Sequence, residues 1–344
     1  MFRWLSSINS GVTFVKTLRW TCEYRVLITR NGLMNSTTPP TELIHVALST
    51  DRNYLQHAGV MIASLLCNAS ESDQLMIHVI HTDLTDADIT QLQSLTHLSK
   101  GPVEIASRKI DGSAFEVFPS LARVSIATYY RLMLHDIFPQ CSRLIYLDVD
   151  ILVLTSLSTL WKTNLSGKVL GAVEMDDQIS AEYDGYGLAP GVRFNAGVML
   201  LDLAAMRQLP LAKAYDETMA MLAPKTVADD QKILNHVFAG KVHILPYAWN
   251  QDTTVYRENV RFTQYDATQI SNAIKHPAIV HFTGRRKPWK LEKDRHVYAH
   301  EYWPYLAKTP WRHRRWAGYI KRIFFPNLKK TPNSTYHKQQ TQGL

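Results

Sequence analysis

One stretch in the middle of the chain restricts the possible folds more than any other: Arg143–Val153, with the sequence RLIYLDVDILV. Two apolar runs rich in β-forming residues enclose a pair of carboxylates. Because side chains alternate along a strand, Asp148 and Asp150 are predicted to point one way and Val149 the other. Carboxylates about 7 Å apart along an extended backbone can share a divalent cation. An Asp-x-Asp triplet is more often a solvated strand end, but the apolar flanks predict that this pair lies at the edge of a core.

Strand-like and helix-like segments alternate before this stretch. Strands are predicted at Ile44–Asp51, Leu75–His81 and Val103–Ile110, with helices at Tyr54–Leu66 and Ala87–Leu98. This alternation is typical of an open, mostly parallel α/β sheet flanked by helices. Ligands of such sheets bind where the strands end, so the polar end of the first strand and the central carboxylates are expected to meet at one crevice.

The remaining segments are predicted to complete one large domain. They are, in chain order, a helix over Val124–Asp136, strands at Val169–Val173 and Phe194–Leu201 with a Gly- and Tyr-rich loop over Glu174–Phe194 between them, helices at Leu203–Leu222 and Asp229–Phe238, and strands at Val242–Leu245 and Ala278–Phe282. A loop of that length inside a compact domain is usually functional or disordered.

The charge of the chain is unevenly distributed. Of 38 Lys and Arg and 30 Asp and Glu, residues 302–344 contain nine bases and no acid, and residues 1–33 contain five bases and one acid. The middle is therefore slightly acidic and the two ends are basic, which favours an anionic partner, either a membrane surface or a nucleic acid. The three cysteines, at positions 22, 67 and 141, have no metal-ligand spacing and favour a reducing compartment.

We divide the chain into four parts. Residues 1–41 are predicted to be an N-terminal extension and linker, which would lie upstream of the true start if translation begins at Met34. Residues 42–300 are predicted to form the α/β domain, residues 301–330 a basic aromatic tail that associates with a membrane, and residues 331–344 a disordered end. No apolar run is long enough to span a bilayer.

The tail contains a basic amphipathic pattern over Arg312–Phe325. Its apolar residues recur at helical spacing, and bases occupy most positions between them: Trp316, Tyr319, Ile320, Ile323 and Phe324 form the apolar stripe. Periodicity alone fits equally a helix on an anionic membrane and a helix docked on its own domain. The absence of acids over 43 residues favours the membrane.

The motifs resemble those of the family-eight retaining glycosyltransferases. Ala127–Leu132 (ATYYRL), followed by LIYLDVDILV, carries the resemblance, and separated motifs extend it in the family's order from about Ile44 to Trp289. The family includes bacterial lipopolysaccharide galactosyl- and glucosyltransferases and, more distantly, glycogenin. The resemblance implies a single GT-A-type (Rossmann-like) domain that uses a UDP-hexose and a divalent metal.

The resemblance also implies roles for individual residues. The metal ligands would be Asp148, Asp150 and His281, and the imidazole favours Mn²⁺, with Mg²⁺ possible. His281 opens a late H-x-x-G-x-x-K-P-W motif, in which Gly284 and Lys287 would contact the diphosphate. The full donor-binding set would be Asp51, Asn53, Tyr54, Arg131, Asp148, Val149, Asp150, Asn195, Asp230, Gln231, Gly284 and Lys287.

Two of these residues would act on the transferred sugar. Asp230 would hold sugar hydroxyls, Gln231 would lie nearest the anomeric carbon, and Asp176 would face the acceptor. Residues 228–231 are also an ordinary acidic helix N-terminus. Arg52 stands where the family commonly has an acid, which is a departure from the family's pattern. Because Gln231 is a poor nucleophile, front-face attack within an ion pair is favoured over a covalent intermediate for retention.

Three functions are compatible with the sequence. The first is a metal-dependent retaining hexosyltransferase, peripheral on the inner face of the cytoplasmic membrane, that moves glucose or galactose to lipopolysaccharide core or another lipid-linked oligosaccharide. The second keeps this donor chemistry with a soluble or protein acceptor, as in glycogenin. The third, a nucleic-acid-binding protein, is disfavoured because the basic residues are terminal and no nucleic-acid motif occurs.

Overall fold

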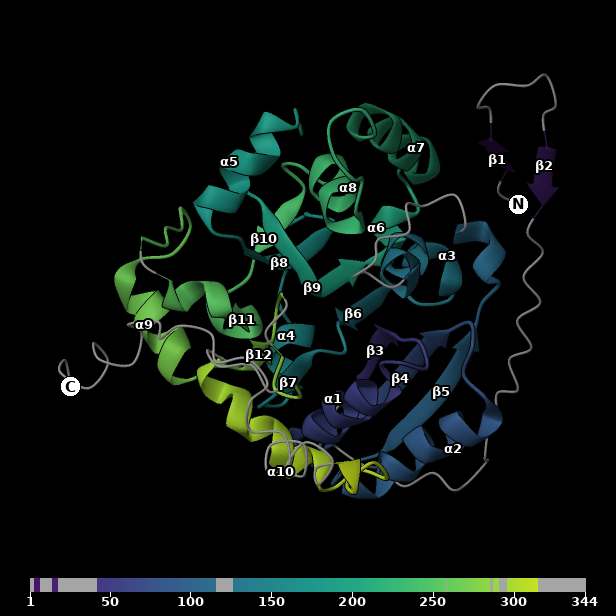
Figure 1. The fold of residues 1–344 in the computed structure, drawn as a ribbon, viewed down its shortest axis with the longest axis vertical. Coiled ribbons are helices and arrows are strands. Elements are labelled where there is room, and N and C mark those ends of the chain that lie inside the picture. The colour runs from purple at the N-terminus through teal and green to yellow at the C-terminus, as the bar shows by residue number, and fades with distance from the viewer. Residues whose placement is uncertain are drawn as a thin grey trace, which may run out of the picture.

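The computed structural model describes residues 3–6, 14–17, 42–115, 126–257, 259–284, 287–290 and 296–314. Its centre is a seven-stranded sheet with the order β10-β8-β9-β6-β3-β4-β5 (Figure 1). The strands are β3 (Leu43–Ser49), β4 (Gln74–His81), β5 (Val103–Lys109), β6 (Arg143–Leu147), β8 (Leu170–Glu174), β9 (Phe194–Asp202) and β10 (Val242–Ile244). Only β9 runs antiparallel to its neighbours, which confirms the predicted mostly parallel α/β sheet.

Ten α-helices occur among the described residues. They are α1 (Leu55–Asn68), α2 (Asp86–Gln93), α3 (Leu134–Ile137), α4 (Ser158–Trp161), α5 (Asp177–Gly185), α6 (Leu203–Met206), α7 (Leu211–Leu222), α8 (Asp230–Val237), α9 (Ala267–Lys275) and α10 (Tyr302–Leu306). Helix α2 begins with a capping box, in which Thr85 accepts from the Asp88 backbone N–H and Asp88 accepts from that of Thr85.

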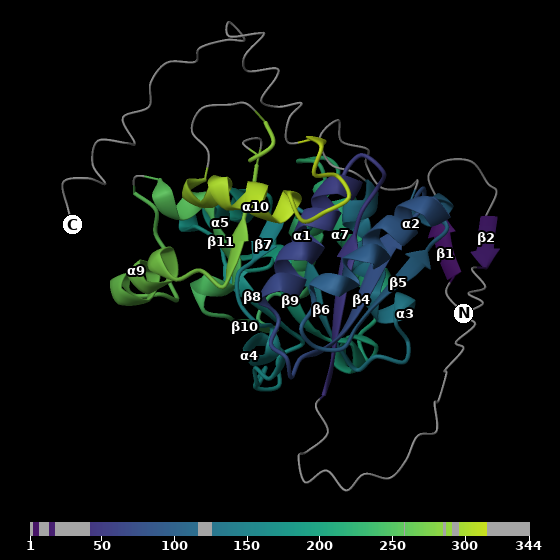
Figure 2. The same ribbon diagram turned by 90° about the horizontal axis from the view of Figure 1, so that it is seen from below.

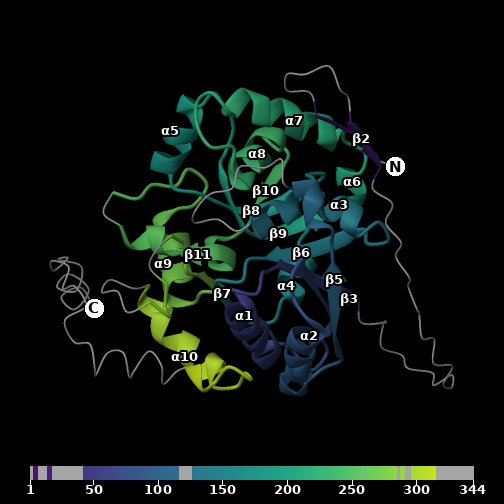
Figure 3. The ribbon, with the colours of Figure 1, turned by 45° about the vertical axis from the view of Figure 1, so that its right-hand side comes forward.

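The strands bury both faces, as parallel strands with crossover helices must. Along β3, Val46 and Leu48 belong to one core and Ala47, which lies between them, belongs to the other. The first core contains residues of α1 and the second contains residues of α7 and α8. Figure 3 shows α1 and α2 away from α7 and α8, with the sheet strands between the two groups.

A second, three-stranded sheet adjoins the first and has the order β11-β12-β7. It contains β7 (Ile151–Val153), β11 (Gln251–Asp252) and β12 (Ile279–His281), and β12 pairs antiparallel with β7. The prediction of one continuous strand over Arg143–Val153 is therefore wrong in one respect. Residues 148–150 form a turn that carries the chain from the large sheet into the small one.

Three other predicted elements differ in detail. The described part of the helix predicted over Val124–Asp136 is a 3₁₀-helix at Ile126–Met133 followed by α3. The segment predicted as a loop over Glu174–Phe194 contains α5. The helix predicted over Leu203–Leu222 is divided into α6 and α7, because Pro210 precedes α7 and cannot continue a helix.

The ends of the chain are described only in part. Strands β1 (Arg3–Ser6) and β2 (Phe14–Thr17) form an antiparallel hairpin. After a 3₁₀-helix at Val297–Glu301, α10 lies alongside α1 (Figures 1 and 2). Residues 315–344, and with them most of the predicted amphipathic tail and the predicted disordered end, are outside the described residues, as is Met34. None of the described helices has the length and apolar composition needed to cross a bilayer.

The C-terminal segment is attached to α1 by close packing at a glycine. A Cβ atom on Gly59 would lie 2.2 Å from Cζ3 of the buried Trp311. Gly59→Ala is therefore expected to lower the free energy of unfolding by about 1–3 kcal/mol, measured by urea denaturation. The matched control is Gly185→Ala in α5, where a Cβ meets nothing within 4 Å and alanine should be neutral or stabilising. Equal stability of the two variants would contradict this packing.

Candidate active site

The Asp-x-Asp turn is fixed by backbone hydrogen bonds to both sheets. The Asp148 N–H donates to the Gly197 carbonyl of β9 at 2.8 Å, and the Phe282 N–H donates to the Asp150 carbonyl at 2.9 Å. Antiparallel pairing of β12 with β7 places His281 opposite Ile151, directly after the turn. Residues separated by more than 130 positions in the chain are thereby brought together at one edge of the large sheet.

Asp148, Asp150 and His281 form a cluster that can hold one cation. The His281 Nε2 atom lies 3.2 Å from Asp150 Oδ1 and 3.8 Å from Asp148 Oδ2, and the three ligand atoms lie within 4.8 Å of one another. The carboxylates point toward the same imidazole because the turn reorients them, and not because a strand alternates. Two carboxylate oxygens and one imidazole nitrogen suit Mn²⁺, and Mg²⁺ less well.

Asn250 orients the imidazole of this cluster. Its Oδ1 lies 2.9 Å from His281 Nδ1, so Nδ1 is assigned as an N–H donor and Nε2 is the nitrogen that faces the carboxylates. The Asn250 amide in turn donates to Asn195 Oδ1 at 2.9 Å. The predicted sugar-side residue Asn195 is thus connected to the cation cluster through a residue that the sequence analysis did not identify.

Gly197 provides the space in which the cluster forms. A Cβ atom at this position would lie 2.3 Å from His281 Cε1 and 2.9 Å from Asp148 Oδ2. A side chain here would displace two of the three candidate ligands. The F-N-A-G motif contains this glycine. Its role could not be predicted from the sequence, because the sequence does not show that His281 and Asp148 lie next to it in the fold.

Two buried cations compensate the carboxylates. The Lys287 ammonium pairs with Asp150. The Arg131 guanidinium, which is 6% exposed, connects two acids, with Nη2 3.2 Å from Asp148 and Nε 2.6 Å from Asp230. Burial alone would raise the pKa of Asp150, but Lys287 and then His281 outweigh burial and hold that pKa well below its usual range.

Asp230 and Gln231 are held by the start of α8. Asp229 caps this helix by accepting from the Lys232 backbone N–H at 2.9 Å. The Gln231 amide accepts from the Ala196 N–H and donates to the Tyr183 hydroxyl, both at 3.0 Å, so its orientation is fixed. Tyr183 belongs to α5, which the sequence analysis treated as loop.

The predicted nucleotide segment lies at the carboxyl end of β3. Asp51 Oδ1 accepts from the backbone N–H groups of Asn53 and Tyr54, at 2.8 and 3.0 Å, and thereby shapes the turn into α1. The Tyr54 ring meets Trp289 edge-to-face, with centroids 6.4 Å apart. Trp289 also stacks on His57, with ring centroids 3.6 Å apart, so the start of α1 and the end of the H-x-x-G-x-x-K-P-W motif are in contact.

The other predicted residues have local structural contacts. Gly284 has a φ of +72°, in the left-handed region that favours glycine, directly after Phe282 and Thr283. Asp176, which is 2% exposed, caps α5 by accepting from the Gln178 N–H. Val149 lies in the turn between the two candidate ligands. The roles of these residues, and of all the other predicted site residues, in binding donor, acceptor or metal stay predictions.

Comparisons with known proteins agree with this arrangement. Residues 45–293 match the model of glycosyl transferase family 8. The chain is 28% identical over 281 residues to General stress protein A of Bacillus subtilis, covering 78% of this chain and 95% of that protein. It is 26% identical to lipopolysaccharide 1,2-glucosyltransferase of Escherichia coli, covering 72% and 71%. A crystal structure of galactosyltransferase LgtC with donor and acceptor sugar analogues superposes with a TM-score of 0.70 at 26% identity, covering 80% and 99%.

The contact between Asn250 and His281 generates a prediction about metal affinity. Asn250→Ala removes the group that fixes the imidazole, and loss of such a partner typically weakens metal binding by about 10- to 100-fold. Titration with Mn²⁺ followed by electron paramagnetic resonance measures the affinity. Asn272→Ala, at an exposed position of α9, is the control and should leave the affinity unchanged. Unchanged Mn²⁺ affinity in Asn250→Ala would count against His281 as a ligand.

Proposed function

Because the chain belongs to glycosyl transferase family 8, a retaining GT-A family, we propose that this glycosyltransferase is a metal-dependent hexosyltransferase that uses a UDP-sugar. It would transfer glucose or galactose. One observation supports the proposal most directly: the candidate ligands Asp148, Asp150 and His281 converge, and Arg131 connects them to Asp230 at the start of α8. The ligands for a cation and the predicted residues of the sugar site form one network.

The cation cluster is suited to a reaction in which a nucleoside diphosphate is the leaving group. Asp148, Asp150 and His281 would hold Mn²⁺, or Mg²⁺, and the bound ion would stabilise the negative charge of the leaving diphosphate as a Lewis acid. Lys287 follows the left-handed turn at Gly284 and offers an ammonium group next to Asp150. We infer that this ammonium and the backbone around Gly284 bind diphosphate oxygens.

The sugar would lie between β9 and the start of α8. Asn195 and Asp230 offer acceptors for its hydroxyls, and Arg131 keeps the buried carboxylate of Asp230 paired. The oxygen and the nitrogen of the Gln231 amide are both hydrogen-bonded, which fixes the orientation of this group. We propose that it lies beside the anomeric carbon of the sugar. An amide is a poor nucleophile, and we therefore favour front-face attack, in which the leaving phosphate oxygen takes the proton of the acceptor hydroxyl.

The UDP moiety would extend toward β3. Asp51, Asn53 and Tyr54 lie where this strand ends, and Tyr54 is part of the aromatic cluster with Trp289. A half-exposed tyrosine ring at this edge can stack on a base. We propose that this segment binds uracil and ribose.

For the acceptor, we propose a lipid-linked oligosaccharide such as lipopolysaccharide core, with Asp176 on the acceptor side. Two relatives support a saccharide acceptor: one is named as a lipopolysaccharide glucosyltransferase, and LgtC was solved with an acceptor sugar analogue. A soluble acceptor, as in glycogenin, is the alternative. The basic tail over Arg312–Phe325 would place the domain, residues 42–300, on the inner face of the cytoplasmic membrane.

The cation cluster predicts the outcome of donor hydrolysis without acceptor. With UDP-glucose, UDP-galactose and GDP-sugars compared, UDP should be released slowly from one UDP-hexose and only with Mn²⁺ or Mg²⁺. Asp150→Ala should reduce the release at least about 100-fold because a metal ligand is lost. Glu104→Ala, at an exposed site of β5, is the control. Metal-independent release, or full activity in Asp150→Ala, would contradict the proposal.

The basic tail predicts binding to anionic vesicles. Residues 315–344 contain six Lys or Arg and no acid, and Trp311 is buried against α1. Truncation after Arg314 should therefore remove vesicle binding and leave the fold and donor hydrolysis intact. Cosedimentation with vesicles containing anionic lipid, compared with neutral vesicles, measures this. Equal cosedimentation of the full and truncated chains would exclude the tail as the membrane contact.

A further inference from the structure

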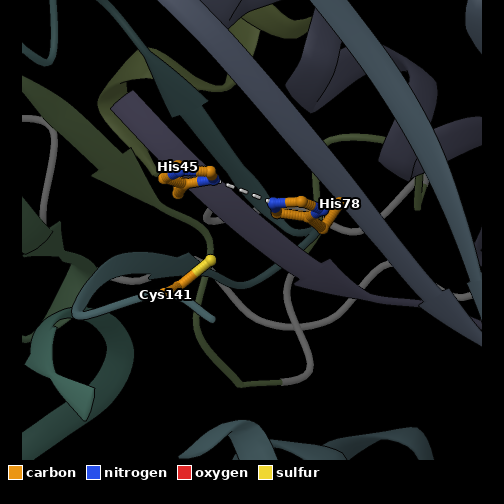
Figure 4. Close-up of side chains that lie close together, drawn as sticks. All are labelled: His45, His78 and Cys141. Carbon is orange, nitrogen blue, oxygen red and sulfur yellow. Dashed lines mark hydrogen bonds between the residues drawn. The ribbon is translucent and has the colours of Figure 1, made fainter. Parts of the chain in front are cut away.

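A second cluster of metal-binding side chains lies in the core on one face of the large sheet. His45 and His78 come from the neighbouring strands β3 and β4, and Cys141 lies just before β6 (Figure 4). Ala47 pairs with His78, so His45 is its diagonal neighbour on the same face. Strand β6 pairs with the other side of β3, which brings Cys141 beneath the two rings.

We propose that His45, His78 and Cys141 bind a Zn²⁺ ion. His45 Nδ1 lies 3.1 Å from His78 Nε2, and the two nitrogens and the sulfur lie within 4.8 Å of one another. Two imidazoles at tetrahedral zinc have their nitrogens about 3.3 Å apart, as Zn–N bonds of about 2.0–2.1 Å require. Figure 4 shows the sulfur directed toward the two rings, and binding of one ion would replace the hydrogen bond between the two nitrogens by bonds from both to the metal.

The protonation states of the two imidazoles and the thiol bear on the binding of a soft cation. Burial lowers the pKa of His78 to about 3, with Arg108 as a smaller cause, and burial lowers that of His45 as well, so both rings are neutral. One of the two facing nitrogens donates the hydrogen bond between the rings, and metal binding would move that proton to the other nitrogen of its ring. Burial raises the pKa of the Cys141 thiol and outweighs the opposite effect of Arg108 and Arg207. Zinc binding would displace the thiol proton.

This site is distinct from the candidate active site in place and in chemistry. Asp51 and Asp148 follow the carboxyl ends of β3 and β6, whereas His45 lies near the start of β3 and Cys141 precedes β6. Two imidazoles and a thiolate favour Zn²⁺, and the carboxylate-rich active-site cluster favours Mn²⁺. The half-exposed His45 gives access to solvent, so a water molecule can complete the tetrahedron.

A bound ion would stabilise the sheet next to the candidate active site. It would connect β3 and β4 to the entry of β6, the strand that leads directly into the Asp148 turn. Zinc would therefore stabilise the part of the sheet that carries the active-site ligands. Bound only by the folded chain, it would raise the thermal unfolding temperature in proportion to the logarithm of its concentration.

Cobalt(II) tests this site in the full chain without reference to activity. A Co²⁺–thiolate bond gives a near-ultraviolet charge-transfer band, which the thiol-free active-site cluster cannot produce. The metal-free wild-type protein should develop this band at one equivalent of Co²⁺, and one equivalent of Zn²⁺ should remove it. Cys141→Ser should lose the band, and the matched control Cys67→Ser, at a half-exposed thiol in α1, should keep it.

A second variant covers the case in which Cys141→Ser does not fold, as judged by circular dichroism. His78→Gln keeps the thiol and should weaken Co²⁺ binding at least about tenfold because one ligand is lost. Absence of the band in the wild-type protein, its persistence in Cys141→Ser, or full affinity in His78→Gln would overturn the zinc site and leave an ordinary polar cluster. Donor hydrolysis with Mn²⁺ is independent of these outcomes.

Discussion

The pairing of buried charge at the junction of two sheets is the interaction on which the rest of the site depends. Asp230 is buried and Asp148 and Asp150 are half-buried, and an unpaired carboxylate in a buried position would cost several kcal/mol. Arg131 and Lys287 supply the compensating charge. Lys287 and His281 keep Asp150 ionised, in the form that binds a cation, whereas burial raises the pKa of Asp230 to about 7 in spite of its pairing with Arg131.

The geometry of this network follows from the small sheet. Strand β12 can pair with β7 only if the chain leaves the large sheet at residues 148–150, and the turn that results aims two carboxylates at His281. The absence of a side chain at Gly197 allows the approach. The positions of the candidate ligands are therefore set by the pairing of the strands.

The two candidate cation sites lie at different positions in the same sheet and have different ligands. Near the carboxyl ends of the strands, two carboxylates at a half-exposed turn and one imidazole suit Mn²⁺, which in the proposed function would also contact the diphosphate. Toward the other edge, imidazoles and a thiol in a packed core suit a soft ion that holds strands together. This difference in ligand softness would direct each ion to its own site.

The alternating strands and helices could be predicted from local periodicity, and the family and the candidate ligands Asp148, Asp150 and His281 from short motifs and their resemblance to the family. The turn at residues 148–150, the contacts by which Asn250 and Tyr183 orient His281 and Gln231, and the space that Gly197 leaves for the ligands depend on how distant segments pack, so they could be seen only in the folded chain. Cys141 shows most clearly what could not be predicted from the sequence. Its spacing from the other cysteines gave no metal signal, since its partners are histidines on two other strands, and pairing between distant strands is set by packing of the whole sheet.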